Sequence, residues 1–379
     1  MSERHYPRKY AVDKFQNALI ASEVYGHRQR ATLRPPRFKR LLFVGKDFGV
    51  GISEGVNALF DVADHKQIAV GDFQQNFFLQ RVDSFGVLWM LLSRENSTET
   101  LLGTITFANI LYGAIVGIKR FEVKDVEYHS TNLPKGFDGY RILQLSDIHI
   151  GSWQGNPEAI RQLVNLVNEQ KADLIVFTGD LVNQQSHELD SFKEILSQLH
   201  APGSVYSVLG NHDYGTYYRW HSRKEEVANL EYLIEQQKDM GWKMLNNDHT
   251  IIHHKSDSIA LIGVENDGEP PFSQFADFPK AIQGTEGMFR ILLSHNPTHW
   301  RREVLPDSDI ELTLSGHTHA MQMEMLGHSL ASLIYPEWSG MYYEGKRALY
   351  VNVGIGYVGL PFRFGAWPEI TVIKLVCEN

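Results

Sequence analysis

Short apolar runs, each ending at a turn residue, dominate the chain from about residue 122 to its C-terminus. Runs of this kind, rich in Ile, Leu and Val, predict buried β-strands. Stretches with apolar residues three or four positions apart, such as Ile160, Leu163 and Val167, separate the first runs and predict amphipathic helices. Alternating strands and helices indicate an α/β domain. The runs with strand character cover 141–147, 172–180, 204–213, 258–264, 288–295, 310–319, 348–354 and 369–376, and the predicted helices cover 157–170 and 187–200.

Upstream of residue 122, charged residues interrupt the apolar stretches, with one exception. Residues 101–118 contain no charge and are followed directly by Lys119 and Arg120. Crossing the hydrocarbon of a bilayer takes about 20 predominantly apolar residues, so this segment is either a membrane helix or a buried or amphipathic helix of a soluble domain. If it spans a membrane, Lys119, Arg120 and Lys124 favour a cytoplasmic position for the C-terminal part of the chain.

Composition excludes several classes of protein. Of the 379 residues, 43% are hydrophobic and 21% are charged, which is typical of a globular protein. Cys377 is the one cysteine, so the chain has no disulfide framework and no cysteine-based zinc or iron–sulfur site. The formal net charge of −9 argues against nucleic acid as a partner. Residues 1–46 nevertheless carry eleven Lys and Arg against three acids, either as a solvated tail or as a contact to anionic lipid.

Five segments share one design, in which an apolar run stops and a metal-ligating residue type follows within one or two positions. Side chains at the carboxyl ends of strands have rigid support and face the crevice where α/β sheets bind ligands. Each segment alone is weak, because such residues commonly form turns and caps, but chance occurrence of all five is remote. In chain order the segments are Asp147-Ile148-His149, Gly179-Asp180, Gly210-Asn211-His212-Asp213, His295, and Gly316-His317-Thr318-His319.

This series of motifs resembles the calcineurin-like metallophosphoesterase family over about residues 138–376, and the tail GIGYVGLPFRFGAWPEI resembles the membrane-associated bacterial branch of that family. The resemblance implies a sandwich of two β-sheets flanked by helices, within the α/β (α+β) class, and a site for two divalent cations. We therefore predict a basic, mostly helical N-terminal region over 1–120 and a catalytic domain over 121–379. The implied ligands are Asp147, His149, Asp180 and His319 for the first cation, and Asp180 as a bridge, Asn211, His295 and His317 for the second.

Ligands of these types also indicate the chemistry. Carboxylate, imidazole and amide groups without thiolate suit Mn²⁺, Fe or Zn²⁺, and we favour Mn²⁺. A pair of such ions lowers the pKa of a bridging water and presents the hydroxide to phosphorus. His212 adjoins a ligand without being one, so it is the candidate to protonate the leaving oxygen or to stabilise its charge, with Asp213 orienting its ring. The predicted activity is metal-dependent hydrolysis of a phosphodiester or pyrophosphate.

The substrate is expected to be phosphorylated and, by analogy with related phosphoesterases, lipid-linked, such as UDP-2,3-diacylglucosamine. Aromatic residues at 214–220 and 335–343 either pack at the rim of the site or form a cap that grips an amphipathic substrate or a bilayer interface. We expect Tyr214 and, as a phosphate clamp, Arg363 to contact the substrate. The enzyme would be membrane-associated with a cytoplasmic catalytic domain, or else soluble in the cytoplasm.

Two other functions stay open. A phosphoprotein phosphatase would need an open or shallow site, and the aromatic insertions argue against one. A scaffold that keeps the fold without the chemistry should have gaps in its ligand set, yet Asn211 and His212 are both present.

Overall fold

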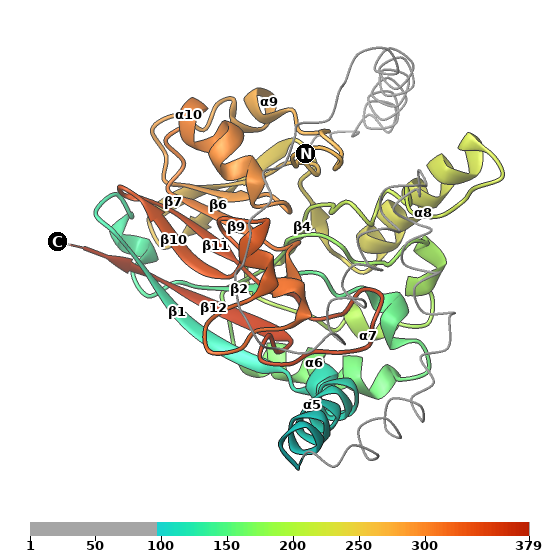
Figure 1. The fold of residues 1–379 in the computed structure, drawn as a ribbon. Coiled ribbons are helices and arrows are strands. Elements are labelled where there is room, and N and C mark those ends of the chain that lie inside the picture. Colours follow the sequence, from blue (N-terminus) through green and yellow to red (C-terminus); the bar gives the residue numbers. More distant parts are fainter. Residues whose placement is uncertain (1–96, 379) are drawn as a thin grey trace, which may run out of the picture. The chain divides into compact units, whose positions relative to one another are not determined.

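Two mixed β-sheets pack face to face, with helices on both outer sides (Figure 1). The computed structural model describes residues 97–378, and most of the predicted N-terminal region, residues 1–96, lies outside the described residues. Within 97–378 each sheet has six strands. The predicted two-sheet sandwich flanked by helices is therefore confirmed.

The first sheet carries the strands that precede three of the five motifs. Its strands β2, β3 and β4 are parallel neighbours, so their carboxyl ends meet at one edge of the sheet. Strand β12 joins this sheet between β1, to which it is parallel, and β2, to which it is antiparallel. In sheet order the strands are β1 (Glu122–Ser130), β12 (Glu369–Cys377), β2 (Arg141–Leu145), β3 (Leu174–Phe177), β4 (Val205–Ser207) and β5 (Lys243–Met244).

The second sheet carries the strands that precede the other two motifs. Strands β7, β8, β9 and β11 run parallel to one another, and antiparallel hairpins close both edges. In sheet order the strands are β10 (Gly340–Glu344), β11 (Arg347–Val351), β9 (Leu312–Ser315), β8 (Arg290–Leu293), β7 (Asp257–Gly263) and β6 (Asp248–His254).

Helices cover the outer faces and connect the parallel strands. The predicted helix over 187–200 is not continuous, and the Glu188 carboxylate accepts the backbone N–H groups of Asn183, Gln184 and Gln185 at its start. A 3-10 turn at Ser186–Leu189 and the short α7 take its place. The α-helices are α5 (Ser97–Ile115), α6 (Pro157–Glu169), α7 (Lys193–Leu196), α8 (Arg223–Asp239), α9 (Phe278–Ile282) and α10 (Leu305–Asp307).

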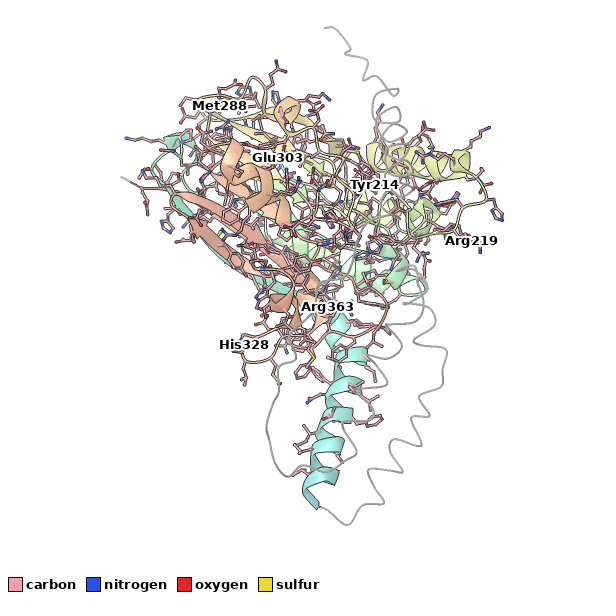
Figure 2. The ribbon with its side chains drawn as sticks, turned by 45° about the horizontal axis from the view of Figure 1, so that its top comes forward. Tyr214, Arg219, Met288, Glu303, His328 and Arg363 are labelled. Carbon is pink, nitrogen blue, oxygen red and sulfur yellow. The ribbon has the colours of Figure 1, made fainter. Side chains whose placement is uncertain are left out.

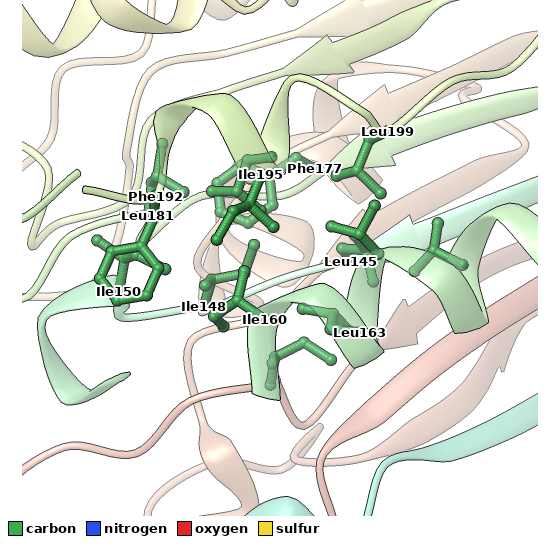
Figure 3. Close-up of a cluster of buried hydrophobic side chains, with 14 of the residues drawn as sticks. Leu145, Ile148, Ile150, Ile160, Leu163, Phe177, Leu181, Phe192, Ile195 and Leu199 are labelled. Atoms are coloured by element: carbon green, nitrogen blue, oxygen red, sulfur yellow. The ribbon is translucent and has the colours of Figure 1, made fainter. Parts of the chain in front are cut away.

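Three apolar clusters hold these layers together. One lies between the two sheets and includes Ile142 of β2 and Leu314 of β9. A second lies on the outer face of the second sheet, under α9. The third fills the space between the first sheet and helices α6 and α7; Figure 3 shows Ile160 and Leu163 of α6 within it. Since fully burying each aliphatic side chain contributes about 1.5–3 kcal/mol, these clusters give the strand ends rigid support.

Helix α5 differs from the others because it packs little of its surface against the domain. Among the described residues, the segment Leu101–Lys119 is the one helix long and apolar enough to cross a membrane by length and composition, and 11% of it is buried. Leu101, Leu102, Ile105 and Ile115 are all exposed. A buried helix does not describe this surface, whereas a membrane helix and an amphipathic helix of a soluble domain both stay open for residues 101–118.

Candidate metal centre

The candidate ligands lie at the edge where strands of both sheets end. Strands β8 and β9 are parallel neighbours in the second sheet, as β2, β3 and β4 are in the first. Each predicted ligand therefore leaves its strand toward the same place. The ligands are Asp147 and His149 after β2, Asp180 after β3, Asn211 after β4, His295 after β8, and His317 and His319 after β9.

Most of these residues have a left-handed backbone, with positive φ. This conformation is uncommon for residues other than glycine, and sparsely populated conformations cost about 1–3 kcal/mol each. Such strain persists where the surrounding structure enforces it, and it gathers at functional sites. The φ angles are 51° at Asp147, 45° at His149, 59° at Asp180, 74° at His317 and 50° at His319.

Two glycines allow the loops to approach the carboxylates closely. A Cβ atom at Gly210 would meet Oδ1 of Asp180, and one at Gly316 would meet Oδ2 of Asp147. At these two positions the absence of a side chain lets backbone amides one or two residues further on face the carboxylates. The backbone N–H of His317 donates to Asp147 at 3.0 Å, for example.

One group of ligand atoms comes from Asp147, His149 and His319. The Nε2 atoms of His149 and His319 face each other at 3.0 Å. Oδ1 of Asp147 lies 3.3 Å from Nε2 of His319 and 3.9 Å from Nε2 of His149. Metal–nitrogen bonds of about 2.0–2.1 Å put neighbouring ligand atoms of one ion about 3 Å apart, so this spacing fits a shared cation.

The second group comes from Asp180, Asn211, His295 and His317. Nε2 of His295 lies 3.1 Å from Oδ1 of Asn211, 3.2 Å from Nδ1 of His317 and 3.2 Å from Oδ2 of Asp180. The same Oδ2 atom lies 3.6 Å from Nε2 of His149 in the first group. Asp180 is therefore the residue between the two groups, the position at which a carboxylate can contact two ions.

The protonation states of these groups favour cations. Burial raises the pKa of Asp147, but the neighbouring His319 and His295 outweigh it and hold that pKa below its ordinary value. Burial together with His295 lowers the pKa of His317 to about 3, so this ring is neutral at pH 7. Ionised carboxylates and neutral imidazoles are the forms that bind divalent metals, so the residues present fit such a centre.

His295 is the exception among the imidazoles. Burial lowers its pKa, but the charge of Asp180 outweighs burial and raises the pKa to about 9. In the protonated form of this ring, Nε2 faces Oδ2 of Asp180 at 3.2 Å. Binding of a metal by His295 is expected to release that proton.

The ring of His212 is half-buried and lies beside the first group. Its centroid is 4.8 Å from that of His149, nearly perpendicular to it. Nδ1 of His212 donates to the backbone carbonyl of Asn183 at 2.6 Å, which orients the ring. The expectation that Asp213 orients His212 is wrong in this respect, because a backbone carbonyl occupies Nδ1.

Asp213 has a different task. Its buried carboxylate accepts the backbone N–H groups of Asp180 (2.9 Å), Leu181 (2.8 Å), Val182 (3.2 Å) and Gly210 (2.9 Å). Burial and the nearby charge of Asp180 raise the pKa of Asp213 to about 7. Asp213 therefore ties the loop that carries Asp180 to the loop that carries Asn211.

Three aromatic side chains line the half-buried side of the centre, and the sequence did not single them out. The ring of Tyr217 lies 4.5 Å from that of His212, and its hydroxyl accepts from Nδ2 of Asn211 at 2.9 Å. The hydroxyl of Tyr335 lies 3.1 Å from Nε2 of His317. Phe272 meets the His317 ring edge to face at 4.5 Å. Tyr217 and Tyr335 fall within the two aromatic runs, but only the fold shows which members reach the ligands.

Replacing Tyr217 by Phe is expected to raise the Mn²⁺ concentration needed for half-maximal activity about tenfold, since groups that orient metal ligands typically contribute 10–100-fold. The lost hydroxyl fixes Nδ2 of Asn211 and so directs Oδ1 toward His295. The matched control is Tyr218→Phe, whose exposed ring packs on Trp220 instead. An unchanged Mn²⁺ requirement in Tyr217→Phe would contradict this role.

The two expected substrate contacts, Tyr214 and Arg363, are both fully buried. The Tyr214 ring packs on Phe275, and its hydroxyl is 3.4 Å from Glu265. The Arg363 guanidinium donates to the carbonyls of Gly356, Ala366 and Val353 at 2.8–3.0 Å. Nη2 of Arg363 also lies 3.0 Å from Nδ1 of His319. Both side chains are enclosed by the protein, and the polar contacts of Arg363 are to backbone carbonyls and to the ring of His319.

Substituting Arg363 by Met is expected to lower the thermal unfolding midpoint in detergent by about 5 °C, because buried carbonyls without a donor cost about 1–3 kcal/mol. Arg161→Met is the control, because Arg161 is exposed and its ion pair with Glu158 is worth little. A normal midpoint combined with a raised KM for a phosphodiester would instead support the phosphate clamp.

Comparisons with known proteins agree with this geometry. A model of the calcineurin-like phosphoesterase family matches residues 140–321. A Danio rerio transmembrane protein with a metallophosphoesterase domain is 34% identical over 320 residues, covering 79% of this chain and 70% of the relative. The metallophosphoesterase YkuE of Bacillus subtilis is 29% identical, covering 76% of this chain and 99% of YkuE.

A further relative is named for its substrate. It is the UDP-2,3-diacylglucosamine pyrophosphatase LpxG of Chlamydia trachomatis, which is 27% identical, with 65% of this chain and 88% of LpxG covered. The family model and the Danio rerio relative together show that this chain belongs to the calcineurin-like metallophosphoesterase family and is a metal-dependent phosphoesterase.

Proposed function

We propose that the chain is a binuclear metal-dependent phosphohydrolase that cleaves a phosphodiester or pyrophosphate. The observation that carries the proposal is the position of Asp180, whose Oδ2 lies 3.6 Å from Nε2 of His149 and 3.2 Å from Nε2 of His295. A carboxylate shared by two sets of ligands suits a pair of cations about 3.5–4 Å apart. Mn²⁺ is the favoured ion for this oxygen and nitrogen set.

The seven ligands would divide into two sets that share Asp180. When bound, the cations supply a water of lowered pKa and positive charge beside the phosphate oxygens. The sets are Asp147, His149, Asp180 and His319 for one ion, and Asp180, Asn211, His295 and His317 for the other.

His212 would act as the proton donor to the leaving oxygen. Because Nδ1 donates to the carbonyl of Asn183, Nε2 is the nitrogen that remains for proton transfer. The ring is half-buried and packs on Tyr217, so it keeps one orientation while staying accessible to a substrate. Asp213 would serve catalysis indirectly, by holding the two loops on either side of His212.

We further propose a lipid-linked substrate and a membrane-associated enzyme. The relative named UDP-2,3-diacylglucosamine pyrophosphatase supports the substrate class, and the exposed apolar surface of α5 supports the location. The region 1–120 would hold the catalytic domain, 121–379, at a bilayer. Lys119 and Arg120 at the end of the apolar segment favour a cytoplasmic catalytic domain.

A substrate panel tests this proposal. The Mn²⁺-loaded full chain in detergent micelles is given bis-p-nitrophenyl phosphate, a nucleotide diphosphate linked to a diacylated sugar, its counterpart without acyl chains, and a phosphopeptide. We expect kcat/KM for the acylated compound to exceed that of its counterpart at least tenfold, roughly, since remote binding energy contributes to catalysis. Preference for the phosphopeptide would indicate a phosphoprotein phosphatase, and a metal-loaded chain that cleaves none of them would indicate a scaffold.

A further inference from the structure

The segment of residues 321–334, between β9 and β10, exposes large apolar side chains to an unusual degree. Leu326 is 92% exposed and Leu333 is 80% exposed. Soluble proteins rarely expose apolar residues in such a group, and groups of this kind mark contacts to proteins or membranes. The exposed members are Met321, Met323, Met325, Leu326, Leu330, Leu333 and Ile334.

The backbone of this segment holds its apolar tip away from the domain. Met325 and His328 exchange two backbone hydrogen bonds, of 2.9 and 3.0 Å, around Leu326 and Gly327. Both central residues have positive φ, 54° and 77°, which is a tight hairpin turn that normally selects Asn-Gly. Leucine is disfavoured at a position with positive φ, and an exposed leucine lowers solubility. Its presence at this tip therefore indicates that the side chain contacts another apolar surface.

The same segment is joined to the base of α5. The backbone of Phe364 donates to Gln322 at 3.0 Å and accepts from Glu324 at 2.8 Å. One residue earlier, the N–H of Arg363 donates to the carbonyl of Gly113 in α5 at 3.2 Å. Figure 2 shows His328, which closes the hairpin, on the side of the domain from which α5 projects.

Residues at the base of α5 are of the types that settle at the headgroup level of a bilayer. Trp367 meets Tyr112 edge to face at 6.0 Å, and the Arg120 guanidinium lies over the Trp367 ring at 4.5 Å. Trp, Tyr and basic residues are enriched at membrane interfaces, next to an apolar span. The exposed apolar surface of α5 therefore continues through this aromatic and basic group toward the 321–334 segment.

The segment also adjoins the metal centre. It begins two residues after His319 and ends directly before Tyr335, whose hydroxyl is 3.1 Å from Nε2 of His317. Ser329, inside the segment, donates to the carbonyl of Ala320 at 2.5 Å. A surface that contacted this segment would thus lie beside the half-buried side of the centre.

We propose that the 321–334 segment enters the interfacial layer of a lipid bilayer, so that it and α5 form one membrane-contact surface beside the metal centre. The proposal rests on the proposed anchorage by α5 and goes beyond it. Lipid is the expected partner, because this surface is continuous with the apolar helix α5 and with the Tyr, Trp and Arg side chains at the base of that helix. A substrate with acyl chains would reach the centre directly from the bilayer.

The test uses an environment-sensitive fluorophore at the hairpin tip of the full chain. Because Cys377 is the one cysteine, Cys377→Ser gives a background in which Leu326→Cys is labelled with a nitrobenzoxadiazole probe. Leu333→Cys, in the following 3-10 turn, provides a second position if the first variant folds poorly. Lys255→Cys is the matched control, since Lys255 is also an exposed turn residue with a φ of 52°. Figure 1 shows its strands, β6 and β7, at the end of the domain away from α5.

The proteins are reconstituted into phosphatidylcholine and phosphatidylglycerol vesicles, with or without lipids brominated near the headgroup end of their acyl chains. We expect brominated lipid to quench the probes at 326 and 333 severalfold more than the probe at 255. Equal quenching at all positions, in protein that floats with the vesicles, would overturn the proposal. So would a probe at 326 that is shielded from water but not quenched, which would indicate a protein partner.

Flotation and activity separate this proposal from the others. A chain that does not float with vesicles would refute anchorage by α5, and the contact surface with it. Hydrolysis of a soluble phosphodiester in detergent is measured on the same proteins. This rate tests the phosphohydrolase activity alone, because it depends neither on anchorage by α5 nor on the contact surface.

Discussion

Asp180→Asn is expected to lower the rate of bis-p-nitrophenyl phosphate hydrolysis by about 10³-fold or more. The substitution removes the negative charge that would neutralise the repulsion between two cations, and metal ions contribute several kcal/mol to phosphoryl transfer. Oδ1 of Asp180 also accepts the backbone N–H of His212 at 2.8 Å, and the asparagine carbonyl can keep this hydrogen bond, so the substitution tests the charge. Element analysis after gel filtration should find fewer than two ions per chain in the variant.

The control for this substitution is Asp307→Asn, an exposed aspartate in α10. It is expected to keep the metal content and rate of the unmodified chain. If Asp180→Asn bound two ions and kept its rate, a bridging role for this carboxylate would be excluded.

His212→Gln is expected to lower kcat by about 10²–10⁴-fold while leaving the metal content unchanged, the range typical of general acid catalysis. Glutamine keeps a polar side chain of similar reach but cannot transfer a proton. The effect should shrink for substrates whose leaving group is a good one, such as p-nitrophenolate, and grow for an alkyl or sugar phosphate. Comparing kcat for these two kinds of substrate therefore reports proton donation.

His253→Gln serves as the control, because His253 is exposed on β6. Loss of metal from His212→Gln would make His212 a ligand, which its position beside His149 and Asp180 also allows. An equal loss of kcat for both kinds of leaving group would exclude the role of proton donor.

The strands next to the ligands could be predicted from the sequence because they are buried on both faces. Strand β3, for example, is Leu-Ile-Val-Phe with every side chain buried, and its run ends shortly before Asp180. Strand β1 is hard to predict because it pairs along one edge with β12 and its sequence is mostly polar, with only Tyr128 and Ser130 buried. Helix α8 was also missed, because most of its residues are polar and its start at Ser222 lies behind an aromatic run.

The motifs identify the candidate ligands, but not the residues that orient them. The residue types Asp, His and Asn at strand ends are enough to name the seven side chains that the fold brings together. Asn183 acts through a backbone carbonyl, which no residue type reveals. For Arg363, the sequence context does not show that the guanidinium is enclosed by backbone carbonyls.

A titration of the chelator-stripped chain with Mn²⁺, following the initial rate of bis-p-nitrophenyl phosphate hydrolysis against bound metal, tests the binuclear centre most directly. The proposed centre predicts no rate in the stripped chain, a rise mainly with the second equivalent, and saturation near two ions per chain, roughly. Full activity at one equivalent, or no activity with two ions bound, would contradict it.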